Sequence, residues 1–324
     1  MPDILIVDGM NLFLRQWSAN PAADSNGAHV GGTMGSLRAI KNMVRDTDCS
    51  RVIVAWEGEG GSRRRRGVYA EYKSGRKPRV NRSHDLDTPR EGYQNLEEQR
   101  LRLVRYLSYL GANQVSVSGC EADDVVSVVC SRWSGLSKVI VSTDQDFFQL
   151  VDPRTSVYSP TRRVMYDEVG ILAETGCSPK NFIFMKTICG DGSDNVKGIR
   201  GLGPKTLLRL FPQLSGPETS LSELLEAAEA LRPNRPSEIK LLKSLLESRQ
   251  LLIDNFRVMQ LSSPSVPPQS VTSILNQASS QAQVNMTAFK LAVARDGLQL
   301  TDPDFFVVFG AYSKRLAEAS REAV

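Results

Sequence analysis

The amino-acid sequence predicts an α/β fold with a central, mostly parallel sheet flanked by helices. The prediction depends first on three short runs, residues 4–7, 52–55 and 139–141, which are continuously apolar. Strands that are buried on both faces of a parallel sheet have this pattern. It depends second on helix-like segments between these runs, because strands that alternate with helices are typical of a parallel sheet.

We expect three helices between and after the apolar runs. The first covers about residues 33–45. The second covers residues 96–110, where leucines recur at helical spacing and Gly111 is placed to end the helix. The third begins near residue 121 and continues with valines at helical spacing.

Two further features divide the chain into regions. Residues 57–95 interrupt the alternation with glycines, basic residues and a polar segment, and an insertion this long in a compact domain is usually functional. After about residue 161 the strand pattern fades and the sequence becomes mostly helical, and a Pro- and Ser-rich stretch at 261–270 has the composition of a linker. We therefore predict an α/β core at 1–160, a helical region at 161–260 and a C-terminal segment of unknown role at 261–324.

The composition narrows the class of protein. Hydrophobic residues make up 41% of the 324 residues, yet no run of about 18 apolar residues occurs, so we expect no transmembrane helix and no membrane partner. The N-terminus lacks the basic stretch of a signal peptide, and the five cysteines are scattered. We therefore expect a reduced, cytoplasmic protein without disulfides or a thiolate zinc site. Since the chain has two histidines, carboxylate chemistry is the main expectation.

Residues 63–82 contain many lysines and arginines and a single acidic residue. Four arginines are consecutive, at positions 63–66. A segment this basic is expected to be solvated and to bind phosphates, and the interleaved Tyr69 and Tyr72 favour contact with a nucleic acid. The alternative is an ordinary charged surface without a ligand.

Acidic residues follow the three predicted strands at equivalent positions. Asp8 comes directly after the first apolar run, Glu57 closely after the second and Asp144 closely after the third. Because ligand crevices lie beyond the carboxyl ends of parallel strands, these acids should converge on one edge of the sheet. Taken singly, each acid is also explained as a turn residue or a helix N-cap.

Two more groups of acids are expected at this edge. Glu121, Asp123 and Asp124 stand at a predicted helix start, and Asp191 and Asp194 stand in a Gly-rich loop. The helix dipole or a turn explains each group by itself. Together, however, so many negative charges require cations, and hard divalent ions prefer oxygen ligands. Such a cluster is best suited to two-metal hydrolysis of phosphodiesters.

Residues 198–206, which read GIRGLGPKT, directly follow the second of these acidic groups. Gly201 and Gly203 permit a tight hairpin with exposed backbone N–H groups. A helix that begins near residue 204 carries Lys205 and Arg209, which are suited to contact DNA phosphates. The alternative is an ordinary turn between two helices.

Together these residues resemble the 5′-nuclease (flap endonuclease) family. The chain is similar to the 5′→3′ exonuclease domain of bacterial DNA polymerase I and to free-standing phage RNase H-type 5′ nucleases. The resemblance spans about residues 4–210, in the stretches IVDGMNL, EYKSGRKP, GCEADDVVSVV, VSTDQDFFQLV and GDGSDNVKGIRGLGPKT. It implies a PIN-like 5′-nuclease core, a helical arch formed by the insertion, and a helix–three-turn–helix element after it.

The resemblance also implies a role for each matched residue. Two Mg²⁺ or Mn²⁺ ions are implied, with the ligands Asp8, Glu57, Glu121, Asp123, Asp124, Asp144, Asp146, Asp191 and Asp194. Lys73 and Arg76 of the arch contact the scissile phosphate. The resemblance implies DNA contacts for Tyr72 and for the hairpin with Gly201, Gly203, Lys205 and Thr206, where relatives hold a K⁺ ion. The basic composition adds Arg63, Arg64, Arg65, Arg66 and Arg209 as DNA-binding candidates. The family generally has Asp where Glu57 stands, and the alternative here is Glu59 or no ligand.

The implied function is that of a structure-specific 5′ nuclease in DNA replication or repair. Its activity is 5′→3′ exonuclease or flap endonuclease, and RNA-primer removal stays open. The implied partner is branched or 5′-ended duplex DNA, or an RNA–DNA hybrid, bound by a monomer in the cytoplasm, which is the host cytoplasm if a phage encodes the chain. Residues 302–309 are either a docking motif for a sliding clamp or single-strand binding protein, or a packed element. The alternative functions are a PIN-type ribonuclease and a structure-specific DNA-binding protein that has lost catalysis.

Overall fold

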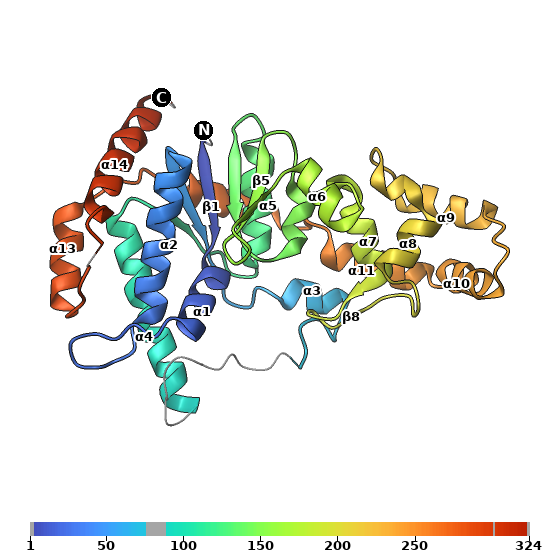
Figure 1. Ribbon diagram of the computed structural model, residues 1–324, viewed down its shortest axis with the longest axis horizontal. Coiled ribbons are helices and arrows are strands. Elements are labelled where there is room, and N and C mark those ends of the chain that lie inside the picture. The colour runs from blue at the N-terminus through green and yellow to red at the C-terminus, as the bar shows by residue number, and fades with distance from the viewer. Residues whose placement is uncertain (1–2, 76–88, 301, 323–324) are drawn as a thin grey trace.

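A mostly parallel sheet forms the centre of the molecule (Figure 1). The computed structural model describes residues 3–75, 89–300 and 302–322. Within these residues the sheet has the strand order β3-β2-β1-β4-β5-β6, in which β6 runs antiparallel to β5 and the other neighbours are parallel. The strands are β1 (Ile4–Asp8), β2 (Arg51–Ala55), β3 (Asn113–Val115), β4 (Lys138–Val141), β5 (Thr155–Ser159) and β6 (Val164–Tyr166).

The central strands are apolar because both of their faces are covered. Ile6 of β1 lies in register with Ile53 of β2 and Ile140 of β4, and all three side chains are fully buried. Successive side chains of a strand point to opposite faces, so Ile6 belongs to one hydrophobic core, whereas Leu5 and Val7 belong to a second core across the sheet.

Helices from both ends of the chain cover the face that carries Leu5. They are α1 (Gly9–Ala19), α2 (Gly31–Thr47), α4 (Pro89–Tyr109), α13 (Met286–Arg295) and α14 (Phe305–Glu322). In Figure 1 the blue α2, the cyan α4 and the red α13 and α14 are gathered at one end of the molecule.

The opposite face packs against the middle of the chain, and its core continues into a helical extension. Near the sheet lie α5 (Ala122–Arg132), η1 (Gln145–Leu150), α6 (Glu168–Thr175), η2 (Pro179–Asn181), α7 (Phe182–Cys189) and α12 (Pro268–Ala278). The extension, seen at the other end of Figure 1, contains the short hairpin of β7 (Gly190–Asp191) and β8 (Val196–Lys197), and then α8 (Pro204–Leu210), η3 (Pro212–Ser215), α9 (Leu221–Ala230), α10 (Pro236–Glu247) and α11 (Arg249–Met259).

The predicted fold class is confirmed, and each predicted strand and helix is present. The helix predicted at 96–110 is longer at its start, since α4 runs from Pro89 to Tyr109. Gly111 follows α4 with φ +74°, as a glycine that ends a helix does. The prediction missed β3 and β5. The chain after residue 161 is mostly helical, as predicted, and its strands there are the short β6 and the β7–β8 hairpin.

The structure describes only part of the predicted insertion at 57–95, and it shows where the predicted C-terminal segment packs. Within 57–95 the structure describes α3 (Arg63–Val68) and the first turns of α4, while residues 76–88 lie outside the described part. After residue 261 the chain returns to the sheet, since α12 contacts β3 and α14 contacts β2. The predicted region boundaries stay predictions. Within the described ranges, no helix combines the length and apolar character needed to span a bilayer.

Candidate functional site

The carboxyl ends of β1 and β4 bring the first two acids together. Asp8 ends β1 and caps α1, with its Oδ1 accepting from the Asn11 N–H at 3.1 Å. Asp144 follows β4 and caps η1, accepting from the Asp146 N–H at 2.9 Å. Ser142 joins the two, because its hydroxyl donates to Asp8 Oδ2 at 3.1 Å and accepts from the Asp144 N–H at 3.1 Å. Sequence analysis missed this serine, since a lone serine after a strand has no distinctive pattern.

The acids at this edge are close enough to change one another's protonation. The pKa of the Asp8 carboxyl is raised to about 6, mainly by burial and in smaller part by the charges of Asp123 and Glu57. Burial also raises the pKa of Asp144, and the charges of Asp8 and Asp123 contribute to the increase. Glu57 is exposed directly beyond β2. The predicted convergence of acids from three strand ends is therefore what the structure has.

The N-terminus of α5 adds Glu121, Asp123 and Asp124, as predicted from the sequence. Asp124 is fully buried, and its Oδ2 accepts from the Glu121 N–H at 3.0 Å. Its Oδ1 is paired with Arg64 and, at 3.0 Å, with Arg65. Both oxygens of Asp124 therefore have partners within the protein, which is the arrangement of a helix cap held by arginines.

Arg65 occupies the centre of this acidic group. The side chain is 3% exposed and pairs with Glu121, with Asp123 at 2.9 Å and with Asp124. Its guanidinium also lies 5.9 Å from the ring centroid of Tyr72. The expectation of a solvated basic segment is wrong for Arg65, because three carboxylates compensate its charge and its planar fork of N–H donors suits them.

Lys73 and Tyr72, predicted to belong to the arch, also reach the acids. The Lys73 ammonium pairs with Glu121, and its backbone N–H donates to the Asp194 carbonyl at 2.8 Å. Tyr72 is buried, and its hydroxyl donates to Glu121 Oε2 at 3.2 Å. Burial opposes ionisation of Glu121, but Arg65 and Lys73 outweigh it and lower the pKa of the carboxyl. Arg76 lies outside the described residues.

A second group of acids surrounds Lys186 of α7. The ammonium lies 2.7 Å from Asp146 Oδ1 and also pairs with Asp191, whose Oδ1 accepts from the Ser193 N–H at 2.7 Å. The pKa of Asp146 is raised to about 7, first by burial and then by the charge of Asp144, while Lys186 acts in the opposite direction. Asp194 is buried near Lys73. Sequence analysis missed Lys186, although a single charge in the otherwise apolar α7 is a signal that it has a buried partner.

The carboxylate oxygens at this edge of the sheet are suitable ligands for divalent cations, but in the structure several of them form ion pairs with lysine and arginine side chains. Carboxylate oxygens are the ligands that Mg²⁺ prefers, and a bound cation stabilises the ionised form of Asp8 and Asp146, which burial first and neighbouring acids second disfavour. Among the described residues, however, no group of three or more His, Cys, Asp or Glu side chains is arranged so that it could hold a metal ion. Basic side chains pair with several of these carboxylates, and the ligand assignments stay predictions. The paired acids are Glu121, Asp123, Asp124, Asp146 and Asp191.

The remaining predicted DNA-binding residues are on the surface. Arg63 and Arg66 of α3 are exposed, in contrast to Arg65 between them. In the turn before α8, Gly201 has φ +89° and is exposed, as are Gly203 and Lys205, whereas Thr206 is partly buried. Arg209 is exposed and pairs with Glu238 at 2.7 Å. A contact with DNA is compatible with these positions and stays a prediction.

Residues 3–176 match the family described as "5′-3′ exonuclease, N-terminal resolvase-like domain". The flap endonuclease Xni of Shewanella sediminis is 31% identical over 230 residues, which are 69% of this chain and 83% of that protein. The 5′-3′ exonuclease of Halalkalibacterium halodurans is 29% identical over 72% of this chain and 75% of its own. The thermostable DNA polymerase I of Thermus filiformis is 29% identical, and the chain spans 28% of that longer protein.

Solved structures show the same fold. The bacteriophage T5 flap endonuclease, solved in a complex with DNA and metal ions, superposes with a TM-score of 0.62 at 18% identity, over 91% of this chain and 99% of its own. Flap endonuclease-1 of Methanococcus jannaschii superposes with a TM-score of 0.54 at 13% identity, over 98% of this chain and 94% of its own. At these identities the likeness concerns the fold.

Proposed function

The chain belongs to the 5′-3′ exonuclease family, and on that premise we propose that it is a structure-specific 5′ nuclease acting on DNA. One observation supports this most directly: acids from β1, β4, α5 and the β7–β8 loop converge at one edge of the sheet, with Lys73 among them. The proposed substrates are branched or 5′-ended DNA duplexes, with RNA–DNA hybrids included, since relatives of the chain are named flap endonucleases and 5′-3′ exonucleases.

We propose that the acids hold two divalent ions, Mg²⁺ or Mn²⁺. Asp8, Glu57, Glu121, Asp123 and Asp124 are the ligands proposed from the first group, and Asp144, Asp146, Asp191 and Asp194 those from the second. Structures of the related fold from T5 contain metal ions, which supports a divalent cofactor. Such ions, when bound, stabilise the charge that develops on the attacking and leaving oxygens of a phosphodiester.

The basic residues of the chain have complementary roles in the proposal. Lys73, with Arg76, meets negative charge on the phosphoryl oxygens at the acidic edge. The exposed Arg63 and Arg66 bind backbone phosphates, which gives affinity without sequence preference. The turn at 201–206, with Lys205 and Arg209, contacts duplex phosphates and holds a K⁺ ion. We propose that the chain acts as a monomer in the cytoplasm.

A second candidate function is a DNA-binding protein without catalysis. The specific observation in its favour is that Arg65, Lys73 and Lys186 occupy carboxylate oxygens that a metal ion would need. On this hypothesis the ion pairs are permanent, and the acids serve to hold the basic segment in place. The PIN-type ribonuclease has no such observation in its favour, and the match to the exonuclease family favours DNA.

Cleavage of a 5′-flap duplex separates these candidates. We expect cleavage in Mg²⁺ but not with a chelator, with products that carry a 5′-phosphate and a 3′-hydroxyl. Asp123→Asn is expected to lower the single-turnover rate by at least about 100-fold, because it removes a metal ligand, and to leave DNA affinity within about threefold. Glu226→Gln, an acid-to-amide change at an exposed position of α9, is the matched control and should cleave normally. Binding without cleavage by the unmodified chain would support the second candidate and overturn the first.

A further inference from the structure

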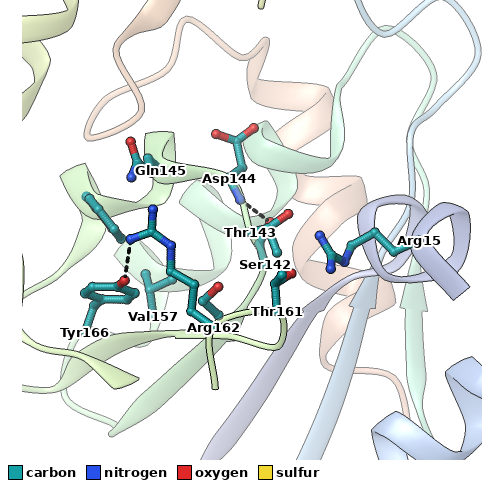
Figure 2. Close-up of a pocket in the computed structure, with 11 residues that line it drawn as sticks. Arg15, Ser142, Thr143, Asp144, Gln145, Val157, Thr161, Arg162 and Tyr166 are labelled. Carbon is teal, nitrogen blue, oxygen red and sulfur yellow. Dashed lines mark hydrogen bonds between the residues drawn. The ribbon is translucent and has the colours of Figure 1, made fainter. Parts of the chain in front are cut away.

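A pocket of about 210 Å³ lies beside Asp144, on a side of the strand end that the acids of α5 do not line. Its walls come from three parts of the chain: Arg15 of α1, Thr143 and Asp144 after β4, and Arg162 in the turn between β5 and β6. Figure 2 shows the guanidinium groups of Arg15 and Arg162 on opposite sides of the pocket, with the hydroxyl residues Ser142 and Thr161 between them.

The pocket combines a basic rim with an apolar wall. Phe148 and Val157 line it together with the ring of Tyr166, and all three are otherwise buried. Arginine binds phosphate through a planar fork of N–H donors, and an apolar or aromatic wall suits the sugar or base attached to that phosphate. At about 210 Å³ the pocket is smaller than the roughly 300–1,000 Å³ of sites that enclose a whole small molecule. Its size is suited to one nucleotide, or part of one, within a longer nucleic-acid strand.

Two contacts hold the Arg162 side chain in place and leave some of its N–H donors available for a ligand. Its Nη1 donates to the Tyr166 hydroxyl at 3.0 Å, and the same group pairs with Glu174. The side chain is nevertheless 52% exposed, and a guanidinium has five N–H donors, so further donors remain for a ligand. The guanidinium is therefore oriented before any ligand arrives, which lowers the entropy cost of binding.

The carboxylate of Asp144 is the one negative group to consider among the residues that line the pocket. In Figure 2 it points away from the space between the two arginines, so it does not face a phosphate bound there. Asp144 also belongs to the acidic edge, whose neighbours Asp8 and Asp123 affect its pKa. The pocket therefore adjoins the acidic edge at Asp144.

We propose that this pocket is a nucleotide subsite that binds a DNA phosphate other than the one cleaved, with Arg15 and Arg162 as the residues that contact it. That the ligand is DNA rests on the proposed nuclease function, but the test of this subsite measures binding and does not require cleavage. Two sources of the phosphate are possible in a DNA substrate, a terminal 5′-phosphate or an internal backbone phosphate. The chemistry of recognition is the same for both.

The test measures binding of a 5′-flap duplex in the presence of a chelator, with Arg162→Ala as the variant. We expect roughly tenfold weaker binding and a plot of log affinity against log salt whose slope is smaller by about 0.7–0.9, as for one lost phosphate contact. Arg163→Ala is the matched control, since Arg163 is an exposed neighbour in the same turn that does not line the pocket, and it should bind within twofold of the unmodified chain. Glu174→Gln removes the ion pair of Arg162 but keeps its guanidinium, and it should also bind normally.

A duplex with a 5′-phosphate and one with a 5′-hydroxyl distinguish the two sources. A loss in Arg162→Ala confined to the phosphorylated duplex assigns a terminal phosphate, whereas an equal loss on both assigns an internal one. Unchanged affinity and salt slope in Arg162→Ala would overturn the proposal, as would an equal loss in Glu174→Gln, which would show a structural role. If the chain binds but does not cleave, the nuclease proposal fails while this one is still decided by the same measurements.

Discussion

Glu57 and Glu59 both follow β2, but their surroundings differ. The charge of Glu57 raises the pKa of Asp8, so its carboxylate lies within electrostatic reach of the acidic edge. The backbone of Glu59 is instead held against the turn before α5, since its carbonyl accepts from the Gly119 N–H at 2.9 Å and from the Ser118 hydroxyl at 3.2 Å. This contrast supports Glu57 as the residue that replaces the family's usual aspartate.

We predict that Glu57→Ala lowers the single-turnover rate of cleavage by at least about 100-fold, the scale of a lost metal ligand. Glu57→Asp should retain part of the activity, because the loop after β2 adapts to a side chain one methylene shorter. Glu59→Ala is the matched control and should be nearly silent. Rates measured across a Mg²⁺ titration decide the matter, and a larger loss in Glu59→Ala than in Glu57→Ala would reverse the assignment.

The role of a residue could be predicted from the sequence when it depends on the position of the residue at a strand end. It could not be predicted when it depends on which side chains the residue contacts in the folded chain. Asp8 and Asp144 were found because a parallel sheet brings strand ends together. The burial of Arg65 was not predicted, because a run of four arginines looks the same in the sequence whether its side chains face water or acidic residues. What selects Arg65 is that α3 turns one arginine toward Glu121 and Asp123 and leaves Arg63 and Arg66 exposed.

At the scale of elements, the β7–β8 hairpin fixes the loop that carries Asp191 and Asp194. Gly198, directly after β8, lies so close to Cys189 and Gly190 at the start of the hairpin that a side chain does not fit there. A Cβ at Gly198 would lie 2.1 Å from the Cys189 carbonyl oxygen and 2.4 Å from the Gly190 nitrogen. Both obstacles are backbone atoms, which cannot move aside without opening the hairpin.

Gly198→Ala is therefore expected to destabilise the chain by about 1–3 kcal/mol, as overpacking does, and to lower cleavage by displacing Asp191. Gly192→Ala is the control in the same loop, because a Cβ there meets no atom within 4 Å, and it should change the free energy of unfolding by less than about 0.5 kcal/mol. Urea denaturation measures both. Equal midpoints for the two variants would contradict the close approach.

The elements that the sequence predicted are the buried ones. β1, β2 and β4 are continuous apolar runs, whereas β5 alternates buried and half-buried residues and β3 has three residues, a length at which no periodicity is visible. β6 is an edge strand with two exposed residues, Val164 and Met165, so burial does not mark it either. The hairpin of β7 and β8 depends on the close approach of Gly190 and Gly198, and the sequence around these glycines has no strand-like pattern.

At the scale of the whole molecule, the C-terminal helix completes the core begun at the N-terminus. Phe305 and Phe309 of α14 are buried, with ring centroids 4.9 Å apart. The Tyr312 hydroxyl accepts from the Val52 N–H of β2 and donates to the Gly111 carbonyl, both at 3.0 Å. These contacts favour the packed alternative for residues 302–309 over a docking motif that presents its aromatic residues.

Phe309→Ala should accordingly lower the free energy of unfolding by about 3–5 kcal/mol, as expected when a large core side chain is truncated. Val307 lies on the same helix and is 72% exposed, so Val307→Ala is the control, with a change of less than about 0.5 kcal/mol. Thermal or urea unfolding measures the difference. A stable Phe309→Ala variant would mean that α14 is detached from the core in solution and free to bind a partner.

The acidic edge couples the stability of the whole chain to pH and to metal. The pKa values of Asp8, Asp123 and Asp146, ordinarily 3.8, are raised to about 6, 6 and 7, in each case first by burial. Between these values and 3.8 the folded chain binds more protons than the unfolded chain, so the free energy of unfolding falls as pH rises through this window. The lowered pKa values of Glu121 and Asp191 act in the opposite direction, but their contribution is complete above about pH 5.

We therefore predict that the chelator-treated chain is less stable at pH 8 than at pH 5, with Asp8 alone contributing about 1.4 kcal/mol between these two pH values. Mg²⁺ at pH 8 should restore stability, by about 2.7 kcal/mol at one hundred times its dissociation constant, because it binds the ionised carboxylates of the folded chain. Asp8→Asn should reduce both the pH dependence and the gain from Mg²⁺, whereas Glu226→Gln should leave both unchanged. Urea unfolding at the two pH values, with and without Mg²⁺, measures each of these. A chelated chain whose stability rises from pH 5 to pH 8 would contradict the prediction, because it would mean that the arginine and lysine pairs already neutralise the edge and leave no charge for a metal ion to compensate.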